Sequence, residues 1–253
     1  MSLNADPGWL RWTPRAVQPT DVAGEFDAAA GTYDGLVGAS PGYHEQLRLS
    51  AKRMQLPRGG AGLRLLDVGC GTGASTAALL AAAPEATIIG VDASAGMLEQ
   101  ARAKSWPSTV SFVHAPAEDL DEGGLQEPFD GIFAAYLVRN LADPDSVLRT
   151  LRDLLRPGAP LAVHDYSLSG SLASKALWTA VCWGVIIPLG GVRSGRTVLY
   201  RYLWRSVLRF DRAVVLVARL RRVGFTHVTA DPVPGWERTI VHTFIARCGG
   251  DTA

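Results

Sequence analysis

The sequence has little cysteine and almost no excess charge. Its three cysteines are odd in number and lie far apart, at Cys70, Cys182 and Cys248. That spacing excludes a disulfide framework, and we expect a reducing environment, the cytoplasm. The formal net charge of the 253 residues is only +1 at pH 7, which argues against a protein whose whole surface binds nucleic acid.

Long hydrophobic runs, targeting signals and metal-binding motifs are also missing. The longest uncharged stretch lies between Lys175 and Arg193 and is interrupted by Pro188 and three glycines, so it does not predict a membrane-spanning helix. The first residues lack the basic and then apolar pattern of a signal peptide. Histidines, cysteines and acids are nowhere spaced like metal ligands, so we expect no metal. The chain is instead rich in hydrophobic residues, 47%, which exclude a disordered protein and allow a large folded domain.

Short apolar runs alternate with helical stretches through the first two thirds of the chain. The runs predicted to be strands are residues 63–68, 87–91, 109–113, 129–136 and 161–165. The stretches predicted to be helices are residues 25–36, 43–56, 74–83, 94–103 and 144–155. Strands that alternate with helices predict an α/β fold, in which a mostly parallel sheet is covered by helices on both faces.

The pattern changes after Ser167. Residues 171–222 have an almost wholly helical pattern, with a break near Pro188, and strands return at residues 225–230 and 238–247. We therefore expect a helical insertion that covers the substrate before the last two strands begin. The predicted organisation is an N-terminal arm with lid helices (1–58), a cofactor-binding core (59–168), the helical insertion (169–223) and C-terminal strands that complete the sheet (224–253).

A glycine-rich loop, G-C-G-T-G at residues 69–73, joins the first predicted strand to the following helix. Open α/β sheets bind their ligands at such strand ends. The spacing also fits a loose dinucleotide fingerprint, but Asp67 lies two residues before the first glycine. A carboxylate there would repel a pyrophosphate and attract the sulfonium and ammonium groups of S-adenosylmethionine. The loop therefore favours S-adenosylmethionine over NAD.

Two further segments suit the nucleoside half of that cofactor. Asp92 ends the second predicted strand, about 20 residues beyond the loop, where a carboxylate accepts hydrogen bonds from ribose hydroxyls. NAD enzymes share this feature, so it does not separate the two cofactors. The segment H-A-P-A-E-D-L follows the third predicted strand, and backbone groups near Ala117 and Glu118 are placed to contact an adenine.

Together, L-D-V-G-C-G-T-G, G-V-D-A-S, A-E-D-L and L-L-R-P-G resemble the motifs of class I S-adenosylmethionine-dependent methyltransferases, over residues 60–165. The resemblance implies a Rossmann-like fold, with a seven-stranded, mostly parallel sheet whose last strand is antiparallel. It implies S-adenosylhomocysteine as the product. It also implies the cofactor-binding residues, which are Asp67, Gly69, Cys70, Gly71, Thr72, Gly73, Asp92, Ala93, Met97, Ala117, Glu118 and Ala135.

Three more segments resemble the C-methyltransferases of ubiquinone and menaquinone biosynthesis, which methylate a ring carbon of a polyprenylated quinol. They are F-D-A-A-A-G-T-Y-D (26–34), Y-L-V-R-N-L-A-D-P-D (136–145) and Y-R-Y-L-W-R-S-V-L-R-F (200–210). The match is partial. This sequence has L-V-R-N at residues 137–140 where the family has F-G-x-R-N, and it has H-D-Y-S at residues 164–167 where the family has an L-E-F-S-like sequence.

The residues in these segments suit the chemistry of carbon methylation, which needs an electron-rich ring. Arginine stays protonated, so Arg139 is expected to stabilise a phenolate and to orient a water that accepts the proton. Asn140 would hold that water or the ring oxygen. Tyr33 would hydrogen-bond the cofactor or close over it.

Two other functions stay open at this point. His164 ends the fifth predicted strand and could deprotonate a hydroxyl, as in an O-methyltransferase, although a structural histidine is the alternative. The first of these functions is therefore O- or N-methylation of a specialised metabolite. The second is that of a protein that binds S-adenosylmethionine without catalysis, since a fold does not fix a function.

The helical insertion combines basic and aromatic residues. From Lys175 to Arg222 there are nine arginines and one lysine against a single acid, Asp211. Arginine stems packed on a lid, docking on an anionic membrane and RNA binding are the three interpretations, and no RNA-binding module is evident. Membrane contact through residues 175–222 would suit a lipophilic aromatic acceptor, whose isoprenoid tail would lie along residues 178–189. A homodimer is a further expectation.

Overall fold

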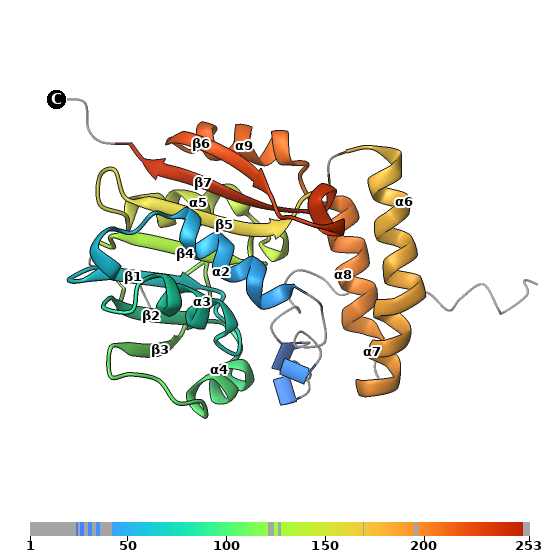
Figure 1. Ribbon diagram of the computed structural model, residues 1–253, viewed down its shortest axis with the longest axis horizontal. Coiled ribbons are helices and arrows are strands. Elements are labelled where there is room, and N and C mark those ends of the chain that lie inside the picture. The colour runs from blue at the N-terminus through green and yellow to red at the C-terminus, as the bar shows by residue number, and fades with distance from the viewer. Residues whose placement is uncertain are drawn as a thin grey trace, which may run out of the picture.

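The computed structural model describes residues 24, 26–27, 30–31, 34–35, 42–120, 124–125, 128–168, 170–194 and 197–249. Within these ranges a seven-stranded sheet forms the centre of the molecule, in the order β3-β2-β1-β4-β5-β7-β6 (Figure 1). The strands are β1 (Arg64–Val68), β2 (Thr87–Asp92), β3 (Val110–His114), β4 (Gly131–Ala135), β5 (Pro160–Tyr166), β6 (Phe225–Pro232) and β7 (Val241–Cys248). The first five strands are parallel, and β7 lies antiparallel between β5 and β6. The predicted fold is confirmed.

Helices cover both faces of this sheet (Figure 1). Alternate strand residues point to opposite faces, so Leu65 and Phe133 pack with one set of helices, and Leu66 and Ile132 with the other. The first set is α2 (Tyr43–Arg53) and α3 (Ala74–Ala82), and the second is α5 (Pro144–Asp153) and α9 (Ala213–Arg222). The helix α4 (Ala95–Arg102) packs on β2 and β3.

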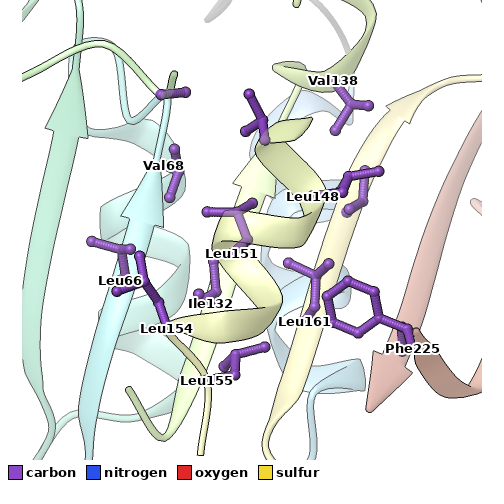
Figure 2. Packing of buried hydrophobic residues seen from close by; sticks show 14 of the residues in the cluster. Leu66, Val68, Ile132, Val138, Leu148, Leu151, Leu154, Leu155, Leu161 and Phe225 are labelled. Atoms are coloured by element: carbon purple, nitrogen blue, oxygen red, sulfur yellow. The ribbon is translucent and has the colours of Figure 1, made fainter. Parts of the chain in front are cut away.

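The start and the buried face of α5 follow from its sequence. The Asp143 side chain accepts a hydrogen bond from the Ser146 backbone N–H at 3.1 Å, and Pro144 occupies the first turn, where its missing N–H costs nothing. Leu148 and Leu151 are three residues apart and therefore share a face. Figure 2 shows both leucines packed between the helix and the strands beneath it, and both are fully buried.

The helical insertion stands beside the sheet, beyond the carboxyl end of β5 (Figure 1). It consists of α6 (Leu172–Val181), a π-helical turn (Cys182–Ile186), α7 (Ile187–Ser194) and α8 (Val198–Arg209). A small core of its own, which includes Trp178 and Tyr200, joins these helices to the start of β7.

The predicted break near Pro188 is wrong, because the helix continues through it from Leu172 to Ser194. A proline inside a regular α-helix clashes with the carbonyl four residues earlier. Here a wider π-helical turn (Cys182–Ile186) ends two residues before Pro188, and this turn departs from the regular α-helical geometry that produces the clash. As a result, residues Leu172–Val192 form a single helix that is long enough and apolar enough to cross a membrane. Length and composition alone are weak evidence for a membrane span.

Two other expectations differ from the structure or fall outside it. The last strand begins at Val241 instead of residue 238, because Trp236–Thr239 form a 3-10 turn after Gly235. Half of the helical stretch predicted at residues 25–36, and residues 1–23 before it, lie outside the described residues.

Candidate functional site

A cleft opens at the carboxyl ends of β1, β2 and β4. The strand order reverses between β1 and β4, and open α/β sheets bind ligands at such a point. Its walls come from the loops that follow β1, β2, β3 and β4, and from Phe26 and Tyr43 in the N-terminal segment.

The glycine loop after β1 forms the floor of this cleft. Gly69 and Gly73 have positive φ angles of 73° and 91°, which side chains rarely adopt. A Cβ on Gly73 would lie 2.8 Å from the Trp106 ring, and one on Gly69 would lie 3.0 Å from Leu137. The loop therefore requires glycine at both positions, and its bare backbone is open to close approach by a ligand.

Asp92 ties the glycine loop to the end of β2. One carboxylate oxygen accepts a hydrogen bond from the Gly71 backbone N–H at 2.8 Å, and the other accepts one from the Ser94 N–H at 2.9 Å. Burial raises the pKa of Asp92, although these two hydrogen bonds oppose the rise. The carboxylate lines the cleft, and each oxygen keeps a second lone pair that can accept a hydrogen bond from a ligand hydroxyl.

Asp67 lies behind the loop and is fully buried. One of its oxygens, Oδ2, accepts hydrogen bonds from the Ser75 hydroxyl at 2.7 Å and the Thr76 hydroxyl at 2.6 Å. The other, Oδ1, has no hydrogen-bond partner among the described residues. Burial, with a smaller contribution from the charge of Asp92, raises the pKa of Asp67 to about 7. An unpartnered buried carboxylate oxygen fits a cationic ligand.

The other wall of the cleft contains Arg139 and Asn140, which lie in a 3-10 turn (Val138–Asn140) after β4. The Arg139 guanidinium donates to the fully buried carboxylate of Asp165 at 2.7 Å and to the Tyr136 carbonyl at 2.8 Å. The Asn140 amide donates to the same carbonyl at 3.0 Å and accepts from the Tyr202 hydroxyl of α8 at 3.2 Å. The helical insertion is thus bonded directly to this wall.

Comparison with known proteins agrees with this geometry. A sequence profile of a methyltransferase domain matches residues 66–161. The chain is 30% identical over 213 residues to the demethylmenaquinone methyltransferase of Clavibacter sepedonicus, covering 83% of this chain and 84% of that protein. It is 32% identical over 206 residues to the ubiquinone/menaquinone biosynthesis C-methyltransferase UbiE of Syntrophotalea carbinolica, covering 80% and 85%.

The chain belongs to this C-methyltransferase family. It is a class I S-adenosylmethionine-dependent methyltransferase. Its fold also matches the methyltransferase that binds the Trm112 activator in Haloferax volcanii, with a TM-score of 0.66 and 18% identity over 92% of this chain and 99% of that one. The glycine cradle and the unpartnered oxygen of Asp67 fit the cationic cofactor of this class of enzyme.

Most residues that the sequence predicted for the cofactor line the cleft of the methyltransferase. Those that do are Gly69, Cys70, Gly71, Thr72, Asp92, Ala93, Met97, Ala117, Glu118 and Ala135. Asp67 and Gly73 do not line the cleft. Gly73 shapes the loop, and Asp67 acts from beneath it through its negative charge. Among the residues predicted to be catalytic, Arg139 and Asn140 line the cleft, and Tyr33 lies outside the described residues.

The structure contradicts the predicted role of His164 as a base. Its ring is fully buried and does not line the cleft. Nδ1 lies 2.8 Å from the Ser50 hydroxyl and Nε2 lies 3.0 Å from the Tyr136 hydroxyl, so both nitrogens are engaged. The pKa of His164 is lowered to about 3, mainly by burial. The positive charges of Arg53 and Arg139 contribute to this decrease, because they repel a protonated ring.

Several residues of the cleft were missed from the sequence. Phe26, Tyr43 and Tyr136 contribute aromatic rings to its walls. Tyr136 is the first residue of the motif Y-L-V-R-N that contains Arg139, so its position in that motif could have predicted its place in the cleft. Tyr43 comes from α2, and no sequence pattern connects that helix with a loop that follows β4.

We predict that Asp92→Asn weakens the binding of S-adenosylhomocysteine by about 10-fold to 100-fold, the scale of a lost hydrogen bond to a charged group. The amide cannot accept from both backbone N–H groups and from ribose hydroxyls at once. Calorimetric titration measures the change. Asp153→Asn, on an exposed part of α5, is the control, and equal affinities of the two variants would contradict the assignment.

Proposed function

We propose that this methyltransferase methylates a ring carbon of a lipophilic quinol or phenol of the menaquinone or ubiquinone type. The observation that carries the proposal is the pair Arg139 and Asn140 in the wall of the cofactor cleft. The related enzymes are named for methylation in ubiquinone and menaquinone biosynthesis, which supports the same substrate class.

Carbon methylation needs an acceptor ring that has lost a phenolic proton. The cofactor supplies an electrophilic methyl group when it is bound. Arg139 keeps its own proton and stabilises the negative oxygen of the ring, while Asp165 and the Tyr136 carbonyl hold the guanidinium in place. Asn140 is fixed by the Tyr136 carbonyl and Tyr202, and it orients the ring oxygen or the water that takes the proton. Alignment of the ring carbon then contributes through positioning. The methylated carbon loses its own hydrogen to water, which restores the aromatic ring.

O-methylation is the less favoured alternative. It requires a base that removes a proton from the acceptor hydroxyl, and His164 is too deeply buried and too weakly basic for that. The carboxylate of Asp92 is on the cofactor side of the cleft and is already bonded to the loop. Carbon methylation releases the same phenolic proton to water, so the missing base does not by itself separate the two reactions, and the relatives named as C-methyltransferases favour carbon.

We further propose that the helical insertion supplies a membrane-docking surface. We define this docking surface as the exposed side of α6 and α7 with the adjoining arginines of α8. Leu172 and Val192 are 84% and 86% exposed, and the side chains of Leu177, Trp183, Val185 and Leu189 are also large and exposed. Such an apolar patch on a protein surface usually marks a binding site.

The charges beside that patch point to an anionic lipid surface as its partner. Arg205 and Arg209 are exposed on α8, which packs against α6 and α7. The Arg201 guanidinium lies 5.8 Å from the centroid of the Trp183 ring, and arginine with tryptophan is typical of membrane interfaces. Docking there would place the cleft close to a lipophilic acceptor, at the inner face of the membrane of a cytoplasmic enzyme.

The enzyme should transfer a labelled methyl group from S-adenosylmethionine to short-chain demethylmenaquinol, and the label should be on a ring carbon. The carbon-13 chemical shift of the transferred methyl group separates a methyl on a ring carbon from one on oxygen or nitrogen. Arg139→Lys keeps a charge but loses the planar fork that bonds Asp165, and we expect it to lower kcat about 100-fold. Arg149→Lys, on the exposed side of α5, is the control. Label on oxygen or nitrogen, or no turnover with any quinol, would refute the proposed substrate class.

Charge reversal at Arg205 and Arg209 should weaken the binding to phosphatidylglycerol vesicles by about tenfold or more, since each basic residue contributes about 1 kcal/mol. Co-sedimentation measures this, with phosphatidylcholine vesicles and Arg149→Glu as controls. Unchanged binding would disprove the docking surface. A dimer that Leu189→Asp dissociates, without any vesicle binding, would show that a second copy of the chain covers this face.

A further inference from the structure

A chain of hydrogen bonds runs from α2, by way of β7 and β5, to the wall of the cleft. It begins at Arg53, whose guanidinium donates to the Thr243 hydroxyl of β7 at 2.8 Å. The Thr243 and Ser50 hydroxyls lie 2.7 Å apart, and the Ser50 hydroxyl lies 2.8 Å from His164 Nδ1. The chain ends where His164 Nε2 meets the Tyr136 hydroxyl at 3.0 Å. Ser50, His164 and Thr243 are all fully buried.

The positions of the hydrogens in this chain can be worked out from its ends. The Ser50 hydroxyl donates to the Gln46 carbonyl at 2.9 Å, because a carbonyl can only accept. Its single proton is then used, so Thr243 and His164 Nδ1 must both donate to Ser50. Nδ1 of His164 therefore carries the hydrogen, and Nε2 accepts the hydrogen bond of the Tyr136 hydroxyl.

This arrangement holds groups in place and does not conduct protons. Arg53, at its start, keeps its proton at any ordinary pH. The neutral ring of His164 has no proton to spare at Nε2. The chain therefore gives the Tyr136 hydroxyl one fixed acceptor inside the protein, and the phenol has no other described hydrogen-bond partner.

Tyr136 connects this chain with the acceptor side of the cleft. Its backbone φ is 56°, a conformation that is unfavourable for a bulky side chain and usually persists only where the surroundings enforce it. Its ring stacks on Tyr43, with centroids 5.6 Å apart and planes 10° from parallel. Its carbonyl accepts from both Arg139 and Asn140. A shift of Tyr136 would therefore move both residues that face the acceptor.

We propose that His164 is a positioning residue, which fixes Tyr136 and through it the acceptor half of the active site. The inference rests on the proposed function, because the acceptor is taken to lie beside Arg139 and Asn140. In this proposal His164 aligns the active site and does not act as a base. Alignment matters because misplacement of reacting groups by about 1 Å can lower the rate about 100-fold.

The test is a double-variant cycle with His164→Leu and Tyr136→Phe. We expect His164→Leu to lower kcat between about 10-fold and 100-fold, with the affinity for S-adenosylhomocysteine unchanged, because the Tyr136 hydroxyl loses its buried acceptor and turns away. The double variant should recover most of that loss, because an apolar pair leaves no unpaired hydroxyl. His242→Leu, at another buried histidine of the sheet, is the control for general damage and should keep kcat.

Three results would overturn the proposal. They are an unchanged kcat in His164→Leu, losses that simply add in the double variant, and a parallel loss of S-adenosylhomocysteine affinity, which would indicate disrupted folding.

A second arm needs no acceptor and separates this inference from the proposed substrate. Nitrogen-15 NMR of the S-adenosylhomocysteine complex should show His164 neutral with its hydrogen on Nδ1 at pH 6, and Tyr136→Phe should shift the Nε2 signal. Hydrogen on Nε2, or a protonated ring, would refute the inference even if the wild-type enzyme proved inactive on quinols. Inactivity with the expected NMR result would refute the substrate class alone.

Discussion

Two carboxylates without a basic partner, the fully buried Asp67 and the half-buried Asp92, set the character of the cleft. Asp67 and Asp92 are close enough that the charge of Asp92 raises the pKa of Asp67, and within the described residues neither forms an ion pair with a lysine or arginine. The raised pKa of Asp67 means that the free energy of unfolding decreases as pH rises from about 4, the pKa in the unfolded chain, to about 7. A cationic cofactor offsets this cost, whereas a pyrophosphate would add to it.

The rest of the fold keeps these carboxylates in place and builds the acceptor side around them. The switch in strand order separates the loops after β1 and β4, which leaves room for the cleft. The glycine loop rests on Asp92, and the turn with Arg139 rests on Asp165 at the end of β5. Tyr202 joins that turn to α8, so the helical insertion and the reacting groups form one connected structure.

The sequence was most informative where the signal is local. Strand and helix positions and the loop that holds the cofactor depend on neighbouring residues, and the structure places these elements within a few residues of the expected bounds. His164 was misjudged because its environment is made by Ser50 and Thr243, which come from distant parts of the chain. Pro188 misled for another reason, since a π-helical turn can absorb a proline that normally ends a helix.

The central claim is that the carboxylates of Asp67 and Asp92 select a cationic cofactor. It is tested most directly by calorimetric titration with S-adenosylmethionine in two buffers of different ionisation enthalpy. Because the pKa of Asp67 is raised to about 7, a bound cation should expel its proton near neutral pH, and affinity should rise with pH until it levels off above 7. The proton release should vanish in Asp67→Asn. Binding without proton release at pH 6.5, or equal affinity for NAD, would contradict the account.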